Sequence, residues 1–429
     1  MLTHSLGFPR IGPDRELKRT CERYWSGKAS REDLEKTARD MRAYKRQVHL
    51  DRGIDLVPSN DFSFYDQVLD TCLMTGAIPE RFKALLERED KDELDLYFAM
   101  ARGYQQDGLD LIPMEMTKWF DTNYHYIVPE FTKDQEFQWF SDKVVEEFRE
   151  AKEAGVTSKP TLIGPVSFLL LGKESERGFD RIDLLERLLP VYKDVLQRLA
   201  QEGAEWVQLE EPFLAMDLSD KRLNAFDRAY AWIRDAAASC KLLLATYFEG
   251  LRDNADKCFQ LPVDAVHLDL VRAPDQLKEA FARVPEGMML SLGLIDGRNI
   301  WKNDIRASWD TVSKAMEKFG QDRLMLGTSC SLLHCPYDLE VEQDSEALPE
   351  AVKEWMAFAV QKLDELKLLR DLAASEEGMK ERSEAFSANV DAHEGRKSSE
   401  KVHDQRVQDR VSRIDEGMAK RKSPFPERK

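Results

Sequence analysis

Short apolar or β-branched runs alternate with long amphipathic stretches from residue 1 to about residue 370. This alternation is typical of repeated βα units that build a parallel sheet. Nine runs are predicted as strands, one more than a closed (β/α)8 TIM barrel needs. They are Leu6–Pro9, Ile54–Pro58, Leu111–Met114, Thr161–Gly164, Trp206–Leu209, Leu242–Phe248, Ala265–Leu270, Met289–Ile295 and Leu324–Gly327.

The surplus strand is the one around Leu111. The stretch that follows it, Trp119–Tyr126, is aromatic and β-prone rather than helical. We therefore predict that residues 110–130 form a hairpin outside the barrel. The expected fold class is α/β, a (β/α)8 barrel with this extra hairpin.

Capping residues predict the first two helices. Gly12-Pro13 opens a helix over residues 13–26, with proline in its first turn. Ser30 and Asp33 form a capping-box pattern for the next helix, and Gly53 ends it before the strand at Ile54.

The composition changes near residue 370. Residues 371–429 hold 13 acidic and 13 basic side chains but too few large apolar residues for a core. We predict a barrel domain over residues 1–370 and a charged, helical inter-domain linker over residues 371–429 that stops before a further element. An apolar stripe in the linker predicts one helix of roughly five turns that docks on a partner surface; its members are Val402, Val407, Val411, Ile414 and Met418.

The chain has a net charge of −17, which falls entirely on residues 1–370. An acidic surface repels phosphate backbones, so nucleic acid is not an expected partner. No apolar run approaches the ~20 residues that cross a bilayer, and no membrane partner is expected. The six scattered cysteines are typical of reduced thiols, which favours a soluble, cytoplasmic protein.

In a TIM barrel, functional side chains follow the C-terminal ends of the strands. Two functions are open on this pattern: a glycoside hydrolase that uses Glu210 or Glu211 with Asp269 or Asp296, and a metal site. Carboxylates that only cap the next helix are the commoner case and are favoured. The strand-end candidates are Arg10, Asp61, Glu210, Glu211, Glu249, Asp269, Asp296, Ser329 and Cys330, and the possible metal ligands are His267, Asp269, Cys330, His334 and Cys335.

A basic cluster stands out in this acidic protein. Arg15, Lys18 and Arg19 share one face of the first predicted helix, near its positive N-terminus. Lys118, flanked by aromatic residues, is a second candidate cation. A solvated basic face is an equally good interpretation. Dinucleotide, P-loop and serine-hydrolase motifs are absent from the sequence.

Five segments closely resemble cobalamin-independent methionine synthase. They are Leu6–Lys18, Asp61–Asp70, Glu115–Tyr126, Gln208–Pro212 and Gly293–Asn299. The resemblance covers essentially residues 1–370 and continues into the tail. It implies an enzyme of two (β/α)8 barrels that transfers a methyl group from 5-methyltetrahydropteroyltri-L-glutamate to L-homocysteine, giving L-methionine. This chain corresponds to the N-terminal barrel and linker.

The resemblance also implies where the chemistry lies. Zinc belongs to the C-terminal barrel; here Thr246, Phe248, Asp269 and Cys330 take the ligand positions, so neither zinc nor any catalytic residue is expected in this chain, and no cobalamin is needed. Homocysteine is reached through the missing barrel, and this chain alone is expected to be an inactive monomer. The family's positions for the folate polyglutamate tail fall on Arg15, Glu16, Leu17, Lys18, Lys118 and Asn123. A purely structural module that does not bind folate is the alternative.

Overall fold

The computed structural model describes residues 1–429 except 238, 343–345, 347, 375–378 and 429. Its centre is one sheet of eight parallel strands, and a bridge between His4 and Leu56 links its two edges, so the sheet forms a nearly closed barrel. The strand order is β1-β14-β13-β12-β11-β10-β8-β2. The strands are β1 (Leu2–His4), β2 (Val57–Ser59), β8 (Ser158–Ile163), β10 (Trp206–Glu210), β11 (Lys241–Ala245), β12 (Ala265–Asp269), β13 (Met289–Ile295) and β14 (Leu324–Thr328).

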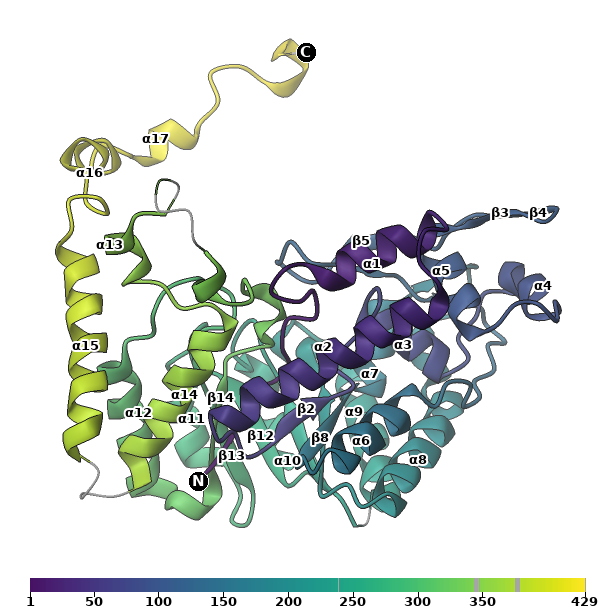
Figure 1. Ribbon diagram of the computed structural model, residues 1–429, viewed down its shortest axis with the longest axis horizontal. Coiled ribbons are helices and arrows are strands. Elements are labelled where there is room, and N and C mark those ends of the chain that lie inside the picture. Colours follow the sequence, from purple (N-terminus) through teal and green to yellow (C-terminus); the bar gives the residue numbers. More distant parts are fainter. Residues whose placement is uncertain (238, 343–345, 347, 375–378, 429) are drawn as a thin grey trace.

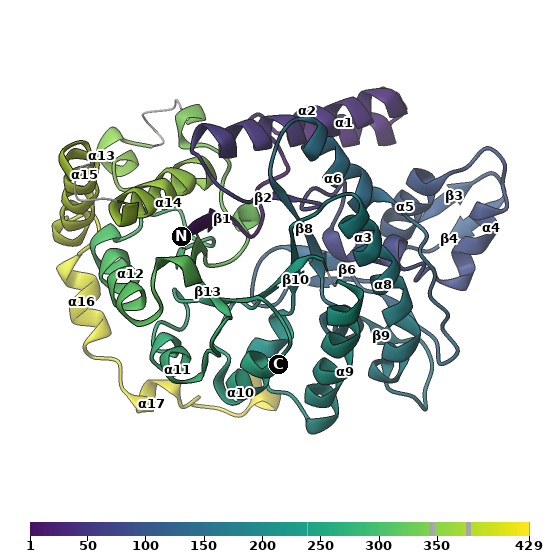
Figure 2. The same cartoon turned by 90° about the horizontal axis from the view of Figure 1, so that it is seen from below.

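Helices surround these strands (Figure 2). Each crossover between parallel strands contains at least one helix, as the predicted TIM-barrel class requires. The main covering helices are α2 (Arg31–Asp51), α6 (Lys143–Glu153), α8 (Leu185–Gln201), α9 (Asp220–Ala236), α10 (Ala255–Gln260), α11 (Gln276–Arg283), α12 (Ile305–Phe319) and α14 (Ala359–Ala374).

The remaining elements lie in the connections. Two antiparallel hairpins stand outside the barrel sheet, and the one formed by β5 (Met116–Lys118) and β6 (His125–Ile127) is the hairpin predicted within residues 110–130. The hairpin of β3 (Tyr104–Gln106) and β4 (Leu109–Leu111) was not predicted, and of the predicted strand Leu111–Met114 only Leu111 is in a strand. The helices are α1 (Glu16–Trp25), α3 (Gln67–Met74), α4 (Lys83–Leu86), α5 (Glu93–Arg102), α7 (Pro165–Leu171) and α13 (Glu350–Lys353). The strands are β3 (Tyr104–Gln106), β4 (Leu109–Leu111), β5 (Met116–Lys118), β6 (His125–Ile127), β7 (Glu130–Phe131) and β9 (Lys173–Glu174), and the 3₁₀ turns are Glu80–Phe82, Arg181–Leu184, Pro212–Ala215, Arg252–Asn254, Gln321–Arg323, Leu332–His334, Leu339–Val341 and Phe425–Arg428.

The prediction of the first strand was wrong. The strand is Leu2–His4, and the predicted run Leu6–Pro9 is the loop after it. Thr3 and His4 are buried, so this strand carries polar side chains inside the protein and lacks the apolar run on which the prediction relied. The first helix also starts later than predicted, at Glu16, and Pro13 precedes it. The capping box of Ser30 and Asp33 is confirmed at the start of α2.

The barrel interior has an apolar layer and, above it, a polar layer. The apolar layer comes from the starts of the strands and includes Trp206, Leu243, Ala265 and Met325. Two residues further along each strand the side chains face the same way, and there the layer is polar. It includes His4, Gln208, His267 and Ser291. This polar layer is the floor beneath the loops at the barrel mouth.

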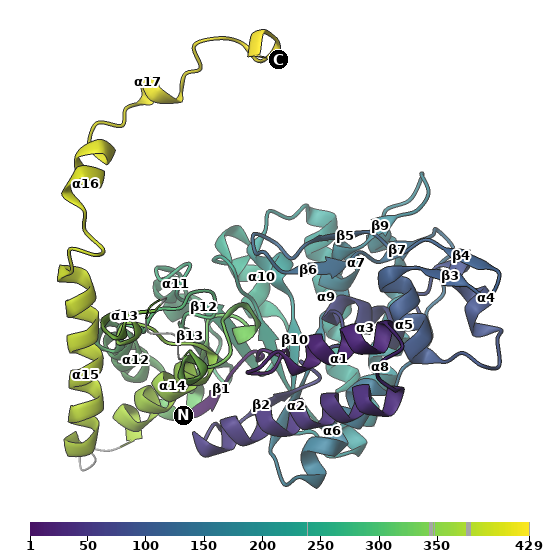
Figure 3. The same cartoon turned by 45° about the horizontal axis from the view of Figure 1, so that its top comes forward.

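The tail does not form the predicted single helix. Helix α15 (Met379–Ser398) packs against α12, where His393 Nε2 lies 3.1 Å from Asp304 Oδ2 and Arg396 lies over the ring of Trp301. Beyond it, α16 (Gln405–Val411) and α17 (Glu416–Ala419) extend away from the barrel (Figures 1 and 3). The five stripe side chains, from Val402 to Met418, are 45–64% exposed, so the stripe does not dock within this chain.

In the part of the chain that the structure describes, no helix is both long and apolar enough to cross a membrane.

Candidate functional site

The hairpin β5–β6 covers the barrel mouth with aromatic side chains. At its tip, the Phe120 ring packs against Phe213 and Phe248, with centroid distances of 5.4 and 5.7 Å. Phe120 and Phe248 both have positive φ angles, 50° and 75°, which bulky residues rarely adopt. Trp119 is buried beneath them. The cavity left below has a volume of about 40 Å³, room for one or two waters.

Asp121 fastens the hairpin tip to the far side of the mouth. Its two carboxylate oxygens accept bonds of 2.7 Å from Arg272 Nη2, after β12, and from Arg298 Nη1, after β13. These guanidinium groups, outweighing the effect of partial burial, lower the pKa of Asp121. The hairpin is therefore tied to two strand ends that are distant in sequence. Reasoning from the sequence missed this clamp, because nothing local pairs Asp121 with either arginine.

The paired glutamates after β10 serve as structural acceptors. Glu211 accepts hydrogen bonds from the backbone N–H of Ser167 at 2.7 Å, from that of Val166, and from the Tyr230 hydroxyl. It therefore caps α7 from a neighbouring strand. A Cβ at Gly164 would come within 2.1 Å of the Glu211 carboxylate, so this close approach requires glycine.

Glu210 is bound on both carboxylate oxygens. Gln208 Nε2 donates at 2.8 Å and the Tyr247 hydroxyl at 2.7 Å. Burial raises the pKa of Glu210 to about 7, against the opposing effect of these bonds and of Lys159. Burial likewise raises the pKa of Glu211 to about 7. A carboxyl group with a shifted pKa at a barrel mouth is often catalytic. Here the shifted groups already accept hydrogen bonds from the protein on both oxygens.

The aspartates at the other strand ends are also used locally. Asp269 accepts from the backbone N–H of Phe248, Val271 and Arg272 at 2.9–3.1 Å. Asp296 accepts from Arg298 N and Asn299 Nδ2, each at 2.7 Å. The interpretation that strand-end carboxylates cap nearby backbone groups therefore accounts for Asp269 and Asp296. A glycoside hydrolase needs space for a sugar between two carboxyls, and this mouth does not provide it.

A buried lysine in the barrel was not anticipated from the sequence. Lys159, on β8, is fully buried and its Nζ donates to Ser5 O at 2.9 Å and to Gln208 Oε1. Burial lowers its pKa to about 7, although Glu210 and Asp61 raise it. Lys159 stands between Ser158 and Pro160, before the predicted run Thr161–Gly164, so the local sequence gives no signal that its side chain faces inward.

The candidate metal ligands are engaged elsewhere. His267 Nδ1 lies 2.8 Å from Ser291 Oγ, and burial lowers the pKa of His267 to about 3, which keeps it neutral. The Cys335 thiol donates to Gly297 O at 3.1 Å. Cys330 is buried. Among the described residues, no three His, Cys, Asp or Glu side chains are grouped so that they could hold a metal ion.

The N-terminal part of the predicted folate-tail site lies at the start of α1. Arg15 is the N-cap residue, exposed and with φ 61°, and no side chain caps the helix. Lys18 is exposed and pairs loosely with Glu22 at 3.7 Å. Leu17 is buried in the core, and Glu16 Oε2 accepts from Asp14 N at 3.1 Å. Glu16 therefore shapes the loop before the helix.

The second part of the predicted site lies on the hairpin. Lys118 ends β5 opposite His125 of β6, and the backbone oxygen of Asn123 accepts from His125 Nδ1 at 2.9 Å. The Lys118 and Asn123 side chains are exposed. Arg10 joins this hairpin to the chain just before α1, because its guanidinium lies 5.2 Å from the Tyr124 ring centroid and donates to Tyr65 O. Arg10 is thus a structural contact rather than a free cation.

Solved structures support the barrel architecture. A putative vitamin-B12-independent methionine synthase from Listeria monocytogenes matches with a TM-score of 0.54 and 14% identity, covering 86% of this chain and 95% of that one. A B12-independent methionine synthase from Shewanella sp. W3-18-1, solved with selenomethionine, gives a TM-score of 0.54 and 16% identity, covering 84% and 92%. At these identities the likeness establishes the fold.

Sequence relatives establish the family. Residues 2–320 match the profile described as the N-terminal domain of cobalamin-independent synthase. The 5-methyltetrahydropteroyltriglutamate–homocysteine methyltransferase of Cytophaga hutchinsonii is 50% identical over 431 residues, covering 100% of this chain and 56% of the relative. That of Flavobacterium johnsoniae is 48% identical, covering 100% and 55%. The chain belongs to the cobalamin-independent methionine synthase family, as its N-terminal domain, and spans about half the length of these relatives.

Proposed function

We propose that this chain is the N-terminal barrel of a methyltransferase that moves a methyl group from 5-methyltetrahydropteroyltri-L-glutamate to L-homocysteine. Its own task is to bind the polyglutamate tail of the folate and to support the catalytic barrel. The observation that carries the proposal is the pair of exposed basic segments, at α1 and on the hairpin, in a chain of net charge −17. Zinc and homocysteine are assigned to the remainder of the whole protein, with residues 371–429 as the linker to it.

The chemistry of the tail fits these segments. A triglutamate carries several carboxylates, and charge-assisted bonds from Arg and Lys are the stronger class of hydrogen bond. The N-terminus of α1 has no side-chain cap, and although Leu17 N donates to Ile11 O at 3.2 Å, the helix still offers a positive dipole end beside Arg15 and Lys18. Lys118 and Asn123 supply a cation and an amide from the hairpin, and the Asp121 clamp keeps that hairpin in place.

Calorimetric titration of the chain with the triglutamate and monoglutamate forms of the folate tests the proposal. We expect the triglutamate to bind more tightly, and Lys18→Ala and Lys118→Ala each to weaken it about tenfold, which corresponds to ~1.4 kcal/mol. The affinity should fall with added salt, because the contacts are charged and exposed.

Lys36→Ala is the matched control, since Lys36 is an exposed lysine of α2 that pairs with Asp40. If the triglutamate binds no better than the monoglutamate, or if all three lysine variants behave alike, the chain is a structural module that does not bind the tail. The methyl-transfer activity itself is tested separately, on the full-length protein.

A further inference from the structure

The two halves of the proposed tail site lie on separate segments of the chain. Arg15 and Lys18 stand at the start of α1, whereas Lys118 and Asn123 belong to the hairpin β5–β6. Among the described residues, the side chains of Arg15 and Lys18 make no hydrogen bond or ion pair with the hairpin. Contacts of other residues must therefore hold the two halves at a fixed separation.

Arg10 joins the chain that leads into α1 to the hairpin. Its guanidinium lies 5.2 Å from the centroid of the Tyr124 ring, next to Asn123, and its Nη2 donates to Tyr65 O. A guanidinium within ~6 Å of an aromatic ring is attracted by it. The Tyr124 hydroxyl donates to the same Tyr65 carbonyl at 3.4 Å. Arg10 and the hairpin therefore share one acceptor, on a third segment of the chain.

This third segment, just before α3, is itself held in place. The backbone N–H of Tyr65 donates to the Tyr97 hydroxyl at 2.9 Å. Asp66 caps α3 through its Oδ1, and its Oδ2 accepts from Ile127 N, on β6, at 2.9 Å. The hairpin thus has two attachments to this segment. Of the two, only the one through Arg10 also involves the chain that leads into α1.

On the other side, the chain between Arg10 and α1 is short and tightly turned. Gly12 has a φ angle of 84°, a left-handed conformation that glycine adopts without strain. Arg15 N donates to Gly12 O and Leu17 N donates to Ile11 O, each at 3.2 Å. The start of α1 is therefore bonded to the residues that directly follow Arg10.

A fixed separation matters for a ligand that binds both segments. Two half-sites held in place bind one flexible ligand more tightly than loosely held ones, because the second contact forms within the complex at a high effective concentration. A triglutamate presents its carboxylates along several residues and can engage both segments at once, whereas a monoglutamate presents them on one residue.

We propose that Arg10 is a positioning residue for the folate tail. Its contacts with Tyr65 and Tyr124 hold the two basic segments at the separation that one triglutamate bridges, and so make the chain selective for tail length. This role rests on the tail-binding function proposed above.

Calorimetric titration with the triglutamate folate tests the role in a double-mutant cycle on the 429-residue chain. Arg10→Met should weaken triglutamate binding about tenfold, as the loss of one of two joint contacts would. Lys118→Ala costs about tenfold with Arg10 present, but should cost less than about threefold in Arg10→Met, because the two halves then no longer act together on one ligand. Arg10→Lys, which keeps a cation and a donor, should bind the triglutamate more tightly than Arg10→Met.

Tyr124→Leu removes the same contact from the hairpin side, and it decides the test if thermal melting shows Arg10→Met unfolded. Arg323→Met is the matched control. Arg323 lies 5.3 Å from the centroid of the Phe319 ring and donates to the carbonyls of Pro285 and Met288, next to the start of β14. Its triglutamate affinity should equal that of the unaltered chain.

Two results would overturn the positioning role while the tail-binding function stands. One is a Lys118→Ala effect that is the same with and without Arg10, and the other is an equal loss of affinity in Arg323→Met. If the unaltered chain binds the triglutamate no better than the monoglutamate, the tail-binding function is wrong and the positioning role falls with it.

Discussion

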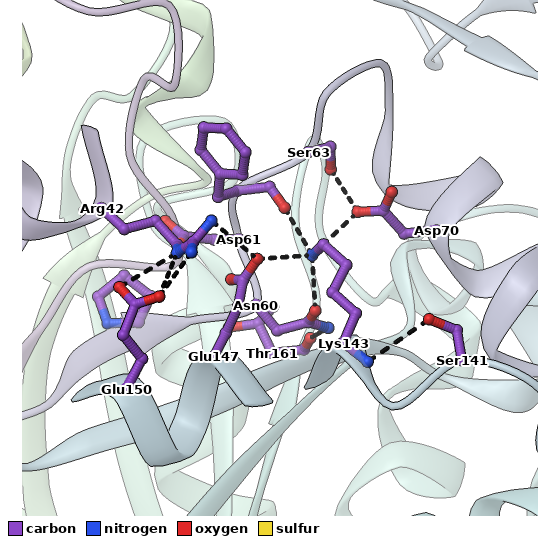
Figure 4. A network of polar contacts seen from close by, with 12 residues as sticks. Arg42, Asn60, Asp61, Ser63, Asp70, Ser141, Lys143, Glu147, Glu150 and Thr161 are labelled. Atoms are coloured by element: carbon purple, nitrogen blue, oxygen red, sulfur yellow. Dashed lines mark hydrogen bonds and ion pairs between the residues drawn. The ribbon is translucent and has the colours of Figure 1, made fainter. Parts of the chain in front are cut away.

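The barrel mouth and the cleft between α2, α5 and α6 both gather carboxylates, which are satisfied in different ways. At the mouth, Glu211 and Asp269 each accept three hydrogen bonds from backbone or side-chain donors. In the cleft, Glu147 Oε1 lies 3.2 Å from Lys143 Nζ and 3.7 Å from Arg42 Nη1 (Figure 4), whereas Glu146 is exposed to solvent. The mouth is at the position where barrel enzymes carry out chemistry, and the cleft is not.

The comparison shows that the position of a carboxylate in the fold is weaker evidence of function than the hydrogen bonds that its oxygens already accept from the protein. A carboxylate whose oxygens all accept hydrogen bonds from the protein already has a structural role, such as capping a helix. The hairpin places Trp119 and Phe120 at the mouth, and the cavity beside Glu210 is only about 40 Å³.

The largest expected effect separates the two kinds of carboxylate by stability. Glu211→Ala leaves Val166 N, Ser167 N and the Tyr230 hydroxyl without an acceptor in a buried place. We expect a loss of about 3 kcal/mol in the free energy of unfolding, measured by urea denaturation. Glu146→Ala should change it by less than about 0.5 kcal/mol. Similar losses of stability in the two variants would show that the two kinds of carboxylate do not differ in this way.

The pH dependence of stability gives a second, smaller contrast. The folded pKa of Glu211 is raised to about 7, above the ordinary value of 4.5. Between these values the folded protein holds a proton that the unfolded chain has released, so this group lowers stability as pH rises from about 4.5 to 7. Its slope is at most on the order of 1 kcal/mol per pH unit. Glu211→Gln should flatten the fall in urea midpoint over this range, whereas Glu146→Gln should leave it unchanged.

Most of the barrel could be predicted from the sequence, because buried parallel strands appear as apolar runs between helices. Seven of the eight barrel strands overlap predicted runs. The exception, β1, contains two buried polar residues: His4 joins the polar layer of the barrel through Ser291, and Thr3 points to the other face and bonds Asp55. The prediction of a single helix in the tail was wrong for the opposite reason. An apolar stripe predicts a helix only where a surface covers it, and Val402 and Ile414 are 45% and 62% exposed.

The site was predictable only as far as its parts are local. The predicted basic cluster rests on a spacing of three and four residues; in the structure Lys18 and Arg19 lie on α1, whereas Arg15 is its N-cap residue. The contacts of Arg10 with Tyr65 and Tyr124 join segments more than 50 residues apart, so no local sequence pattern predicts them. The ion pair of Arg42 on α2 with Glu147 on α6 joins distant segments in the same way, so it emerges only from the folded structure.

The smallest expected effect on stability comes from Asp121→Ala, which would unfasten the hairpin from Arg272 and Arg298. The Asp121 side chain is 55% exposed, so we expect a loss of only about 0.5 kcal/mol or less. Its pKa is lowered in the fold, so its contribution is present at neutral pH and is lost as pH falls through that value. The clear signal should be faster amide hydrogen exchange in residues 116–127. Asp275→Asn, which alters an exposed surface pair with Lys278, should leave that exchange unchanged. Unaltered exchange in Asp121→Ala would mean that the packing of Phe120 on Phe213 and Phe248 holds the mouth closed without the clamp.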